Sequence, residues 1–512
     1  MRIGMNGPSY TLGSSAAADE EAINWMCQSI ESQASIVPTN AYGGKNAQGL
    51  KFMMGTPGLS IFSALPKSPV RGLCVALGRL FVVAGTTLYE LDSTGAQTVR
   101  GVVNSDGLPA SISFNGIQIL IVSNGQAFCL TLATNVLVEV TSLLAGIPVK
   151  CDYDDTYFVV MFEDSNKYQM SQVLDGTTWP GQLVNEVSVF AGNISTIICN
   201  HRELGVSGYE RSQVYQDTGS AEIFDAIPGA LIEMGNGPMF SPALIDNSVF
   251  FVNQDARGAR MCWRLNGYTP TRISTYAVEY DLAQYADISG LVSYSYQDSG
   301  HLFWVLYIPG AQWSWVFDVV EGSWHKRAQW LVPLAKWVSH FSWNHVYAFG
   351  MHLVGDWNTG NLYQMSLKNL SDTLGLGIGY GDGGYGDGGY GGAPVPVAIR
   401  RLRRSPTISD EMKRIFHASL TLDFDTGLGP QPPLLDGNGN PRAPQANLSW
   451  SDDRGKTWSN IYMLNCGMAG QYKTRAIKRR LGQSRYRVYQ LSVTDPIPWT
   501  LVDAYLEAGP QQ

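Results

Sequence analysis

Short apolar runs separated by turn residues recur at a regular pace from about residue 70 onward. The first unit has apolar runs at residues 74–77, 79–84 and 87–91. The second has runs at 110–114, 117–122 and 127–132, and its Asn-Gly pairs at 115–116 and 124–125 are strong hairpin-turn signals. Similar units begin near residues 149, 194, 242, 290 and 331. These starts lie roughly 40–50 residues apart, which is typical of a propeller blade with three or four strands.

The repeated units favour an all-β protein built around a β-propeller of about six or seven blades. A four-stranded sheet cannot bury both of its faces alone, whereas radial stacking of blades buries them and leaves only short edges. No sharp WD or kelch signature accompanies the repeat, so the prediction rests on its spacing. A pair of β-sandwiches is the competing architecture, and it needs fewer and longer strands.

The same pattern divides the chain into four parts. Residues 1–66 are expected to form an irregular N-terminal arm for assembly contacts, with one short helix from Ala18 to Ser32. Acidic residues occupy the first turn of this helix, where they suit the positive end of its dipole, and an apolar stripe follows. The acidic residues are Asp19, Glu20 and Glu21, and the stripe is Ile23, Met26, Cys27 and Ile30. Residues 67–372 are the predicted propeller.

The other two parts are a Gly/Tyr-rich tract at residues 373–393 and a more regular β region at residues 394–512. The composition of the tract predicts a flexible loop. Its Asp382 and Asp387 suggest calcium, but two carboxylates are too few ligands for a good site. In the last part apolar and polar residues alternate as in half-buried strands, at Leu420, Leu422 and Phe424 and at Tyr489, Leu491 and Val493. This region is either a separate platform domain or the closing blade or blades of the propeller.

Composition adds information about the surface. Charged residues make up 15% of the chain, glycine accounts for 55 of 512 residues, and aromatics make up 11%. A typical domain has about 25% charged residues. The many glycines and aromatics exclude a coiled coil and global disorder. A surface so poor in charge is either largely covered by partners, because interface cores are depleted in charge, or simply neutral and polar.

The formal charge of −8 is unevenly distributed along the chain. Residues 1–392 hold 19 Lys and Arg against 33 Asp and Glu, whereas residues 393–512 hold 16 against 10. The acidic part is a poor candidate for gripping DNA, but it suits a conduit through which DNA slides. The C-terminal part has two basic clusters: Arg400, Arg401, Arg403 and Arg404, and Lys473, Arg475, Lys478, Arg479, Arg480, Arg485 and Arg487. These clusters either contact phosphates, or form a solvated face or a dock for an acidic neighbour.

The cysteines and the longest apolar run indicate in which cellular compartment the chain is made and whether it spans a membrane. The seven cysteines are Cys27, Cys74, Cys129, Cys151, Cys199, Cys262 and Cys466. They are odd in number and form no C-x-x-C pair, so we expect free, mostly buried thiols made in a reducing compartment. The first ten residues show no secretion signal. The run from Leu302 to Phe317 is shorter than the ~20 residues of a membrane helix and is broken by Pro309, so we expect no membrane span.

A search for chemistry finds no strong motif. The sequence has no phosphate-cradling P-loop, no H-E-x-x-H and no G-x-S-x-G elbow. The histidines never fall at i, i+4 metal spacing, and each is expected to be a surface or hydrogen-bonded core residue. The adjacent carboxylates Asp154-Asp155 and Asp410-Glu411 point to opposite faces if they lie on strands. We therefore expect no enzyme, no catalytic, cofactor-binding or metal-binding residues, and no cofactor.

The sharpest local motif runs from Ser451 to Trp458 and fits S-x-D-x-G-x-T-W, the Asp-box pattern of sialidase-type propellers. Its expected role is structural: Asp453 accepts hydrogen bonds from the turn, Gly455 supplies an unusual φ, and Trp458 packs beneath. The motif and the 14 tryptophans keep open an alternative function, a carbohydrate-binding or sialidase-like propeller that uses paired carboxylates or aromatic stacking.

Several segments, in order along most of the chain, are similar to one known family. They are Ala18-Asp19, Ile23-Asn24-Trp25, Ile30-Glu31-Ser32, Gly55-Thr56-Pro57-Gly58-Leu59, Pro69-Val70-Arg71-Gly72-Leu73, Arg272-Ile273-Ser274-Thr275, Ala277-Val278-Glu279, Trp315-Val316-Phe317-Asp318, Gly322-Ser323-Trp324-His325, Gly467 to Arg480, and Val493-Thr494-Asp495-Pro496. In these segments the chain resembles the tail hub or nozzle proteins of short-tailed phages, the packaged-DNA stabilisation family.

The resemblance implies a non-enzymatic virion protein of the phage tail that is assembled in the cytoplasm of a bacterial host. It implies a homohexameric ring below the portal and its adaptor. That ring extends the DNA channel, retains packaged DNA until ejection, and passes double-stranded DNA through its lumen without sequence-specific binding. The outer surface of the ring is expected to bind tailspikes or tail fibres, and its end a plug or needle.

Overall fold

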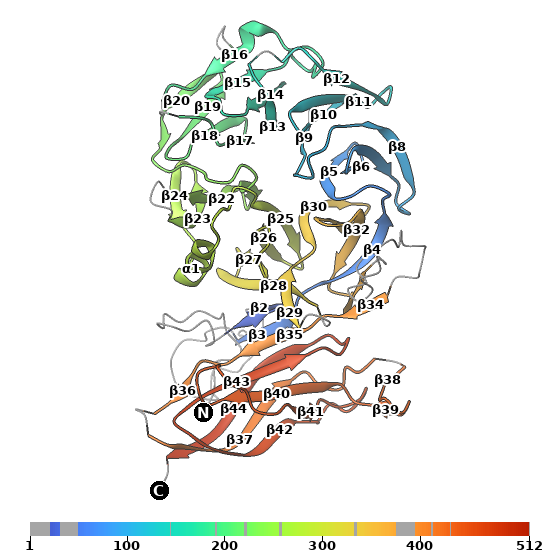
Figure 1. Ribbon diagram of the computed structural model, residues 1–512, viewed down its shortest axis with the longest axis vertical. Coiled ribbons are helices and arrows are strands. Elements are labelled where there is room, and N and C mark those ends of the chain that lie inside the picture. Colours follow the sequence, from blue (N-terminus) through green and yellow to red (C-terminus); the bar gives the residue numbers. More distant parts are fainter. Residues whose placement is uncertain are drawn as a thin grey trace, which may run out of the picture.

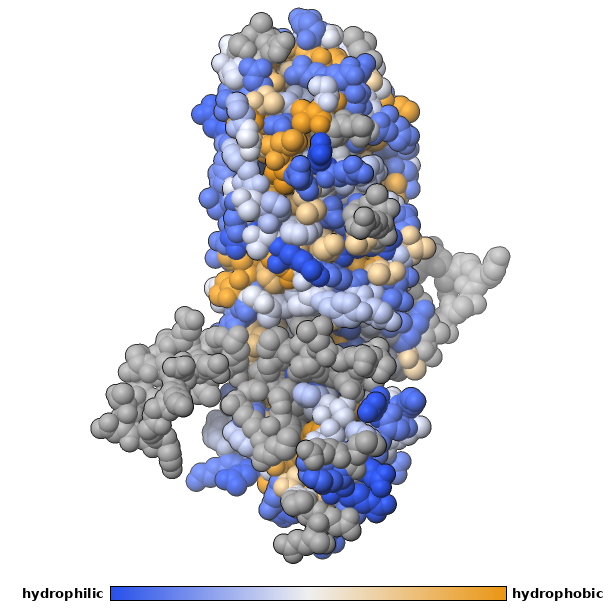
Figure 2. All heavy atoms as spheres, turned by 90° about the vertical axis from the view of Figure 1, so that its left-hand side faces the viewer, coloured by the Kyte–Doolittle hydropathy of each residue, from blue (hydrophilic) through white to orange (hydrophobic). Residues whose placement is uncertain are grey.

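The computed structural model describes residues 21–30, 50–143, 145–189, 192–219, 223–254, 259–331, 335–374, 395–410, 413–430 and 432–510. In this part of the chain β-strands dominate. Figure 1 shows radial sheets arranged in a ring in the upper part of the molecule and a two-layered sandwich below them. Figure 2 shows the molecule from the side, with the propeller above and the smaller sandwich below.

The described residues form seven blades, each with four antiparallel strands. Blade 1 contains β5 (Val70–Ala76), β6 (Arg79–Ala84), β7 (Thr87–Leu91) and β8 (Gln97–Val102). Blade 2 contains β9 (Ser111–Phe114), β10 (Gln118–Ser123), β11 (Gln126–Thr131) and β12 (Val136–Val140). Blade 3 contains β13 (Pro148–Asp154), β14 (Tyr157–Phe162), β15 (Lys167–Met170) and β16 (Val184–Glu186), with a 3-10 turn at Gly181–Leu183. Blade 4 contains β17 (Thr196–Asn200), β18 (Glu203–Ser207), β19 (Ser212–Asp217) and β20 (Phe224–Ile232).

The remaining blades complete the ring. Blade 5 contains β21 (Ala243–Ile245), β22 (Ser248–Gln254), β23 (Arg260–Asn266) and β24 (Thr269–Arg272), and the helix α1 (Tyr276–Gln284) follows it. Blade 6 contains β25 (Val292–Asp298), β26 (His301–Tyr307), β27 (Ser314–Asp318) and β28 (Ser323–Leu331), and β29 (Lys336–Ser339) pairs with β28. Blade 7 contains β30 (Ser342–Ala348), β31 (Met351–Asp356), β32 (Asn361–Ser366) and β4 (Gly58–Ala64).

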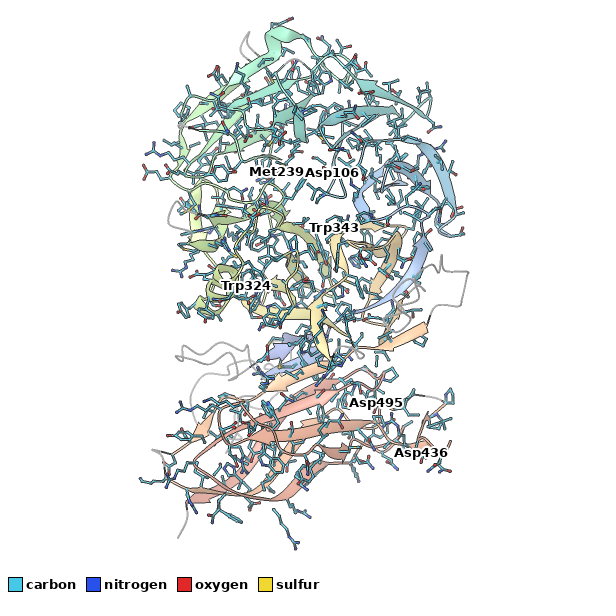
Figure 3. All side chains as sticks on the ribbon, viewed as in Figure 1. Asp106, Met239, Trp324, Trp343, Asp436 and Asp495 are labelled. Atoms are coloured by element: carbon cyan, nitrogen blue, oxygen red, sulfur yellow. The ribbon has the colours of Figure 1, made fainter. Side chains whose placement is uncertain are left out.

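The ring closes through a strand from the beginning of the chain. Strand β4 pairs with β32, with Leu59 opposite Met365, so the outer strand of the last blade precedes the first blade in sequence. The seam between blades 7 and 1 is also tied by the indole of Trp343, which donates to the carbonyl of Val70 at 2.5 Å (Figure 3). This pairing joins residues about 300 positions apart, so backbone hydrogen bonds close the last blade.

Each blade is buried on both faces because its neighbours pack against it. In β6, Phe81 and Val83 share a cluster with Ile121 of blade 2, whereas Leu80 and Val82 face blade 7. A strand that is buried on both faces reads as a continuous apolar run, without alternation. The second strand of the first blade, β6, accordingly appears in the sequence as an unbroken apolar run from Leu80 to Ala84.

The lower domain packs two sheets face to face. One sheet contains β1 (Ala22–Ile23), β35 (Arg401–Arg404), β43 (Tyr486–Val493), β40 (Gln445–Ser451) and β41 (Tyr462–Asn465), with β36 (Ile408–Ser409) paired to β43. The other contains β2 (Trp25–Ile30), β3 (Leu50–Gly55), β44 (Thr500–Pro510), β37 (Ile415–Phe424) and β42 (Ala476–Ser484). Two short hairpins, β33 (Ser371–Leu374) with β34 (Val395–Ala398) and β38 (Leu434–Leu435) with β39 (Pro441–Arg442), complete the fold. An apolar cluster that includes Trp25, Leu420 and Leu491 fills the space between the two sheets.

The prediction of an all-β propeller is confirmed, and the described residues give it seven blades. The competing pair of sandwiches is wrong for the central region, and the C-terminal β region forms one sandwich and no closing blade. The predicted helix from Ala18 to Ser32 is also wrong, because its described residues form β1 and β2. The described part of residues 1–66 is not an irregular arm either, because β2 and β3 pair in the sandwich and β4 completes blade 7. Residues 375–394, with most of the Gly/Tyr-rich tract and both of its aspartates, lie outside the described residues.

Candidate functional site: the junction between propeller and sandwich

The two domains share a continuous sheet. Strand β1 pairs in parallel with β28 of blade 6, with Ile23 beside Lys326, and antiparallel with β35 of the sandwich, with Ile23 opposite Leu402. An 11-stranded sheet therefore runs from blade 6 into the sandwich. Backbone hydrogen bonds cross the domain boundary, so rotating one domain against the other requires this ladder to break.

Asn24 is the polar centre of this junction. It is 2% exposed, and its Nδ2 donates to the carbonyls of Ala328 and Arg400, both at 2.8 Å. Its Oδ1 accepts from the amide of Ala328 at 2.9 Å. One side chain thus satisfies backbone groups of both the blade and the sandwich. Its φ of 61° lies in the left-handed region, which asparagine tolerates better than most residues.

Glu21 links two cations from the two domains. Its carboxylate contacts Nζ of Lys326 at 3.2 Å and Nη1 of Arg404 at 2.8 Å. Each cation also lies over an aromatic ring, Lys326 at 3.6 Å from the centroid of Trp313 and Arg404 at 5.1 Å from that of Trp458. Partial desolvation makes such cation–π contacts stronger than they are on an open surface.

The first basic cluster lies in this junction. Arg401 is 2% exposed and Arg403 is 0% exposed. Arg400 stacks on Trp330, with its Cζ 3.9 Å from the ring centroid. The guanidinium of Arg401 packs onto Gly55, where an added Cβ would lie 2.4 Å from Nε. Burial lowers the pKa of Arg401 to about 10, partly opposed by the charge of Asp372. The interpretation of this cluster as a surface for phosphate contact is therefore wrong for its two most buried members.

Asp372 anchors the hairpin β33–β34 to the propeller. Its Oδ1 accepts from the amide of Leu59 at 2.8 Å and its Oδ2 from Nε2 of Gln329 at 2.5 Å. Burial raises the pKa of this carboxyl to about 6, although its hydrogen bonds and Arg401 favour the charged form. Asp372 thus holds the closing strand β4 and the outer strand of blade 6 together.

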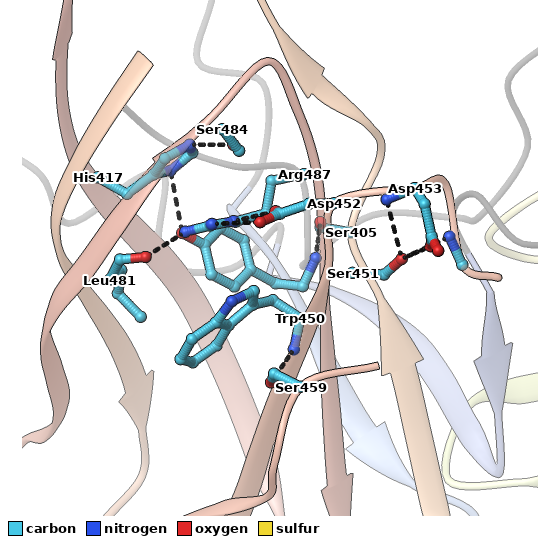
Figure 4. Close-up of polar contacts among 12 residues, drawn as sticks. Ser405, His417, Trp450, Ser451, Asp452, Asp453, Ser459, Leu481, Ser484 and Arg487 are labelled. Atoms are coloured by element: carbon cyan, nitrogen blue, oxygen red, sulfur yellow. Dashed lines mark hydrogen bonds and ion pairs between the residues drawn. The ribbon is translucent and has the colours of Figure 1, made fainter. Parts of the chain in front are cut away.

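The Asp-box motif forms a tight turn between β40 and β41 in the sandwich (Figure 4). Asp453 accepts from the amides of Lys456 and Thr457 at 2.9 and 2.8 Å and from the hydroxyl of Thr457 at 2.6 Å. Gly455 has a φ of 87°. These hydrogen bonds hold the pKa of Asp453 well below its usual range. The hydrogen-bonding role expected for Asp453 is confirmed, and the motif lies outside the propeller blades.

Behind this turn a buried brace joins the two sheets of the sandwich. Arg487 makes two contacts with Asp452, at 2.6 and 2.8 Å, and donates to the carbonyl of Leu481 at 2.6 Å (Figure 4). His417 contacts the hydroxyl of Tyr489 at 3.0 Å, and burial lowers the pKa of this histidine to about 4. The imidazole is therefore neutral at physiological pH and serves as a hydrogen-bonding core residue.

Among the described residues no group of three or more His, Cys, Asp or Glu is placed to hold a metal ion, and no helix is long and apolar enough to cross a membrane. A cleft between blades 4 and 5 is lined mainly by apolar residues such as Ile198, Val249 and Phe251. At its rim the hydroxyl of Tyr268 donates to Glu203 at 2.8 Å. No disulfide joins the seven cysteines, all of which are described, and five of them are buried, in line with the prediction.

The adjacent carboxylates have separate surroundings. Asp154 is buried, and burial raises its pKa to about 6, whereas Asp155 pairs with Arg202 at 2.6 Å. Asp410 is exposed, and Glu411 lies outside the described residues. The described members of these pairs therefore form no shared site. The sequence reasoning missed Asn24 and Glu21, because both lay in the segment assigned to a helix.

The fold and the junction define an all-β, two-domain protein in which a propeller is braced against a β-sandwich. Residues 38–369 match the phage stabilisation model described as bacteriophage P22 Gp10, beta-propeller, and residues 400–509 match the model described as bacteriophage P22 Gp10, beta-sandwich. The chain therefore belongs to the bacteriophage P22 Gp10 family. This places it among the phage structural proteins of packaged-DNA stabilisation, as a component of the virion tail.

The other comparisons are weaker. No curated protein matches the chain. Among solved structures, the N-terminal domain of Nup159 is 10% identical with a TM-score of 0.38, over 61% of this chain and 95% of that one. YCF48 from Cyanidioschyzon merolae is 11% identical with a TM-score of 0.40, over 60% and 98%. The computationally designed Ika8 protein is 9% identical with a TM-score of 0.33, over 60% and 98%. Scores this low carry no argument about function.

Proposed function

We propose that the chain is a non-enzymatic subunit of the tail nozzle of a short-tailed phage. In this proposal about six copies form a ring by repeating one heterologous interface. The ring lies below the portal and its adaptor, extends the DNA channel and retains packaged DNA until ejection. Tailspikes or fibres dock on its outside, and a plug or needle closes its end. The match of both domains to the P22 Gp10 family is the observation that carries the proposal.

The construction of the junction supports a mechanical role. Packaged DNA loads a channel wall, and a wall of two hinged domains would yield at the hinge. Here the shared sheet, the Asn24 hydrogen bonds and the Glu21 ion pairs resist that movement. The buried Asn24 side chain has partners for both of its polar atoms, and a paired buried group of this kind favours one arrangement of the domains over others.

The distribution of charge supports passage of DNA without tight binding. Residues 1–392 carry 14 more acidic than basic side chains, counted from 33 Asp and Glu against 19 Lys and Arg. An acidic wall repels phosphates, so DNA in the lumen would slide without sequence-specific contacts. The low overall charge of 15% suits subunits whose surfaces are largely covered by neighbours.

Mass measurement of the purified chain mixed with portal–adaptor complexes tests the proposal. We expect one complex that carries about six copies of the chain, together with an image that shows a central opening. A chain that remains monomeric and never joins the adaptor contradicts the proposal, as does turnover of a small substrate.

A further inference from the structure

The second basic cluster, unlike the first, presents an exposed surface. We refer to three exposed arginines of this cluster and two exposed arginines from elsewhere in the sandwich together as the basic end. They are Arg414, Arg454, Arg479, Arg480 and Arg485. Figure 2, which faces the left side of Figure 1, shows hydrophilic side chains over the sandwich below the propeller. Of the remaining members of the second cluster, Lys473 and Arg475 are also exposed, whereas Arg487 is buried in the brace and Lys478 lies 3.7 Å from the ring centroid of Tyr462.

The strand register brings these arginines together. Ile415 pairs with Ser484, so the residues that flank this pair, Arg414 and Arg485, are neighbours. Arg454, at the tip of the Asp-box turn, lies 4.7 Å from the ring centroid of Tyr486, the residue next to Arg485. Three chain segments thus converge where the C-terminal strand also ends, because β44 pairs with the start of β37 (Figure 1).

The remaining two arginines extend this surface along β42, the edge strand of its sheet. The register against β37 shifts next to Arg480, which has a φ of 60°. A non-glycine residue in the left-handed region costs free energy, and its occurrence at a functional surface is a recognised pattern. From Arg479 to Arg485 the strand spans at most about 20 Å, at about 3.3 Å per residue.

The charge of the basic end is not neutralised within the described part of the chain. None of its five arginines forms an ion pair with a described carboxylate. Of the described carboxylates around it, Asp452 is paired with Arg487 and Asp453 is bound within its own turn, while Asp410, which the pairing of Ser409 with Tyr486 places beside Arg485, forms no ion pair with it. Exposed arginines of the propeller are paired, as Arg202 is with Asp155 and Arg272 with Glu279. Five exposed cations that outnumber the carboxylates around them repel one another, so this surface fits a polyanion.

We propose that the basic end binds the phosphate backbone of double-stranded DNA. This inference rests on the proposed function, which brings DNA to the molecule. Duplex DNA carries one charge per about 1.7 Å when both strands are counted, so the length of duplex that lies along a 20 Å surface holds about a dozen phosphates. The planar guanidinium fork matches phosphate geometry better than an ammonium does. The arginines contact only the DNA backbone, so binding does not depend on the DNA sequence. The otherwise acidic ring thereby has one region that binds DNA.

The test measures binding of the full-length chain to a short DNA duplex of mixed sequence across salt concentrations from about 50 to about 200 mM. The variant combines Arg479→Gln, Arg480→Gln and Arg485→Gln. The matched control combines Arg202→Gln, Arg211→Gln and Lys336→Gln, three exposed cations of the propeller, and removes the same charge. We expect the variant to reduce the slope of log K against log salt by about 3, at about 0.9 per phosphate contact, and the control to leave it unchanged.

Three outcomes overturn the inference: equal effects of variant and control, binding of polyglutamate but not DNA at the basic end, or loss of assembly on the adaptor by the variant. The last two would assign the surface to an acidic protein partner. Ring formation is scored separately on the same variant, which we expect to assemble normally. A wild-type chain that binds DNA through these arginines but forms no ring supports the inference and contradicts the proposed function.

Discussion

The two arginine clusters of the C-terminal region look alike in sequence but lie in different surroundings. In the first, Arg401 and Arg403 are buried and hold the junction between domains. In the second, Arg479, Arg480 and Arg485 face solvent along one end of the sandwich. The difference arises from neighbours: β35 is an inner strand between β1 and β43, whereas β42 is an edge strand. A count of charges therefore says little about binding until the position of each strand in its sheet is known.

The largest expected difference between the clusters is in stability. Arg401→Ala removes a buried guanidinium and leaves Asp372 without its neighbouring cation, so we expect a loss of about 3–5 kcal/mol in the free energy of unfolding. Arg480→Ala, an exposed change of the same type, should alter it by less than about 0.5 kcal/mol. Urea unfolding of both variants measures this contrast. Equal effects would remove the distinction drawn between the clusters.

The next effect tests the junction at Asn24. Asn24→Ala leaves two carbonyls and one amide without their partner in a buried place, and we expect a loss of about 3 kcal/mol. Asn24→Gly loses the same hydrogen bonds but relieves the strain at φ 61°, so it should be less destabilising by about 1 kcal/mol. Differential scanning calorimetry compares the two variants. Coupling of the two domains through Asn24 is supported if the propeller and the sandwich melt together in the wild type and separately in the variants. Unchanged melting in the variants would contradict this coupling.

Asp372 is expected to make the free energy of unfolding depend on pH, by an amount similar to or smaller than the effect of Asn24→Ala. Its pKa is raised to about 6 in the folded chain, whereas an unfolded aspartate titrates near 3.9. The native state therefore binds the proton more tightly, and this contribution to stability is present below about pH 4 and is lost as pH rises to about 6. The loss amounts to about 2–3 kcal/mol. Unfolding measured from pH 4 to 7 should show this slope, and Asp372→Asn should reduce it but leave the part contributed by Asp154, whose pKa is also raised to about 6. An unchanged slope in the variant would contradict the role given to Asp372.

The smallest effect is expected for the partly buried ion pairs. Glu21→Gln removes the charge that joins Lys326 to Arg404 but keeps the shape of the side chain. Because these groups are near the surface, we expect a loss of about 0.5–1 kcal/mol that shrinks as salt is added. Thermal melting at low and high salt checks this, with Glu139→Gln, an exposed carboxylate of blade 2, as the control. A salt-independent loss would assign Glu21 a packing role.

The segment around Trp25 shows where local pattern misleads. Ile23, Met26, Cys27 and Ile30 have the spacing of a helical stripe, yet they lie on β1 and β2. Their partners are Leu402 and Met53 among others, and the strand β28 lies about 300 residues away. Pairing with distant strands outweighed the local helical pattern, because the conformation of a strand depends strongly on the strands beside it. For the same reason Asn24 gave no signal, because its acceptors come from two different domains.

The sequence by itself determined the blades and the Asp453 turn, because each depends on residues close together in the chain. Apolar strands, hairpin turns and an aspartate that accepts hydrogen bonds from its own turn can each be recognised from a few neighbouring residues. The tertiary structure alone decided that β4 closes the ring, that β1 joins the domains and that one arginine cluster is buried while the other is exposed. These features depend on which strands become neighbours, and that choice is made by burial of the whole chain.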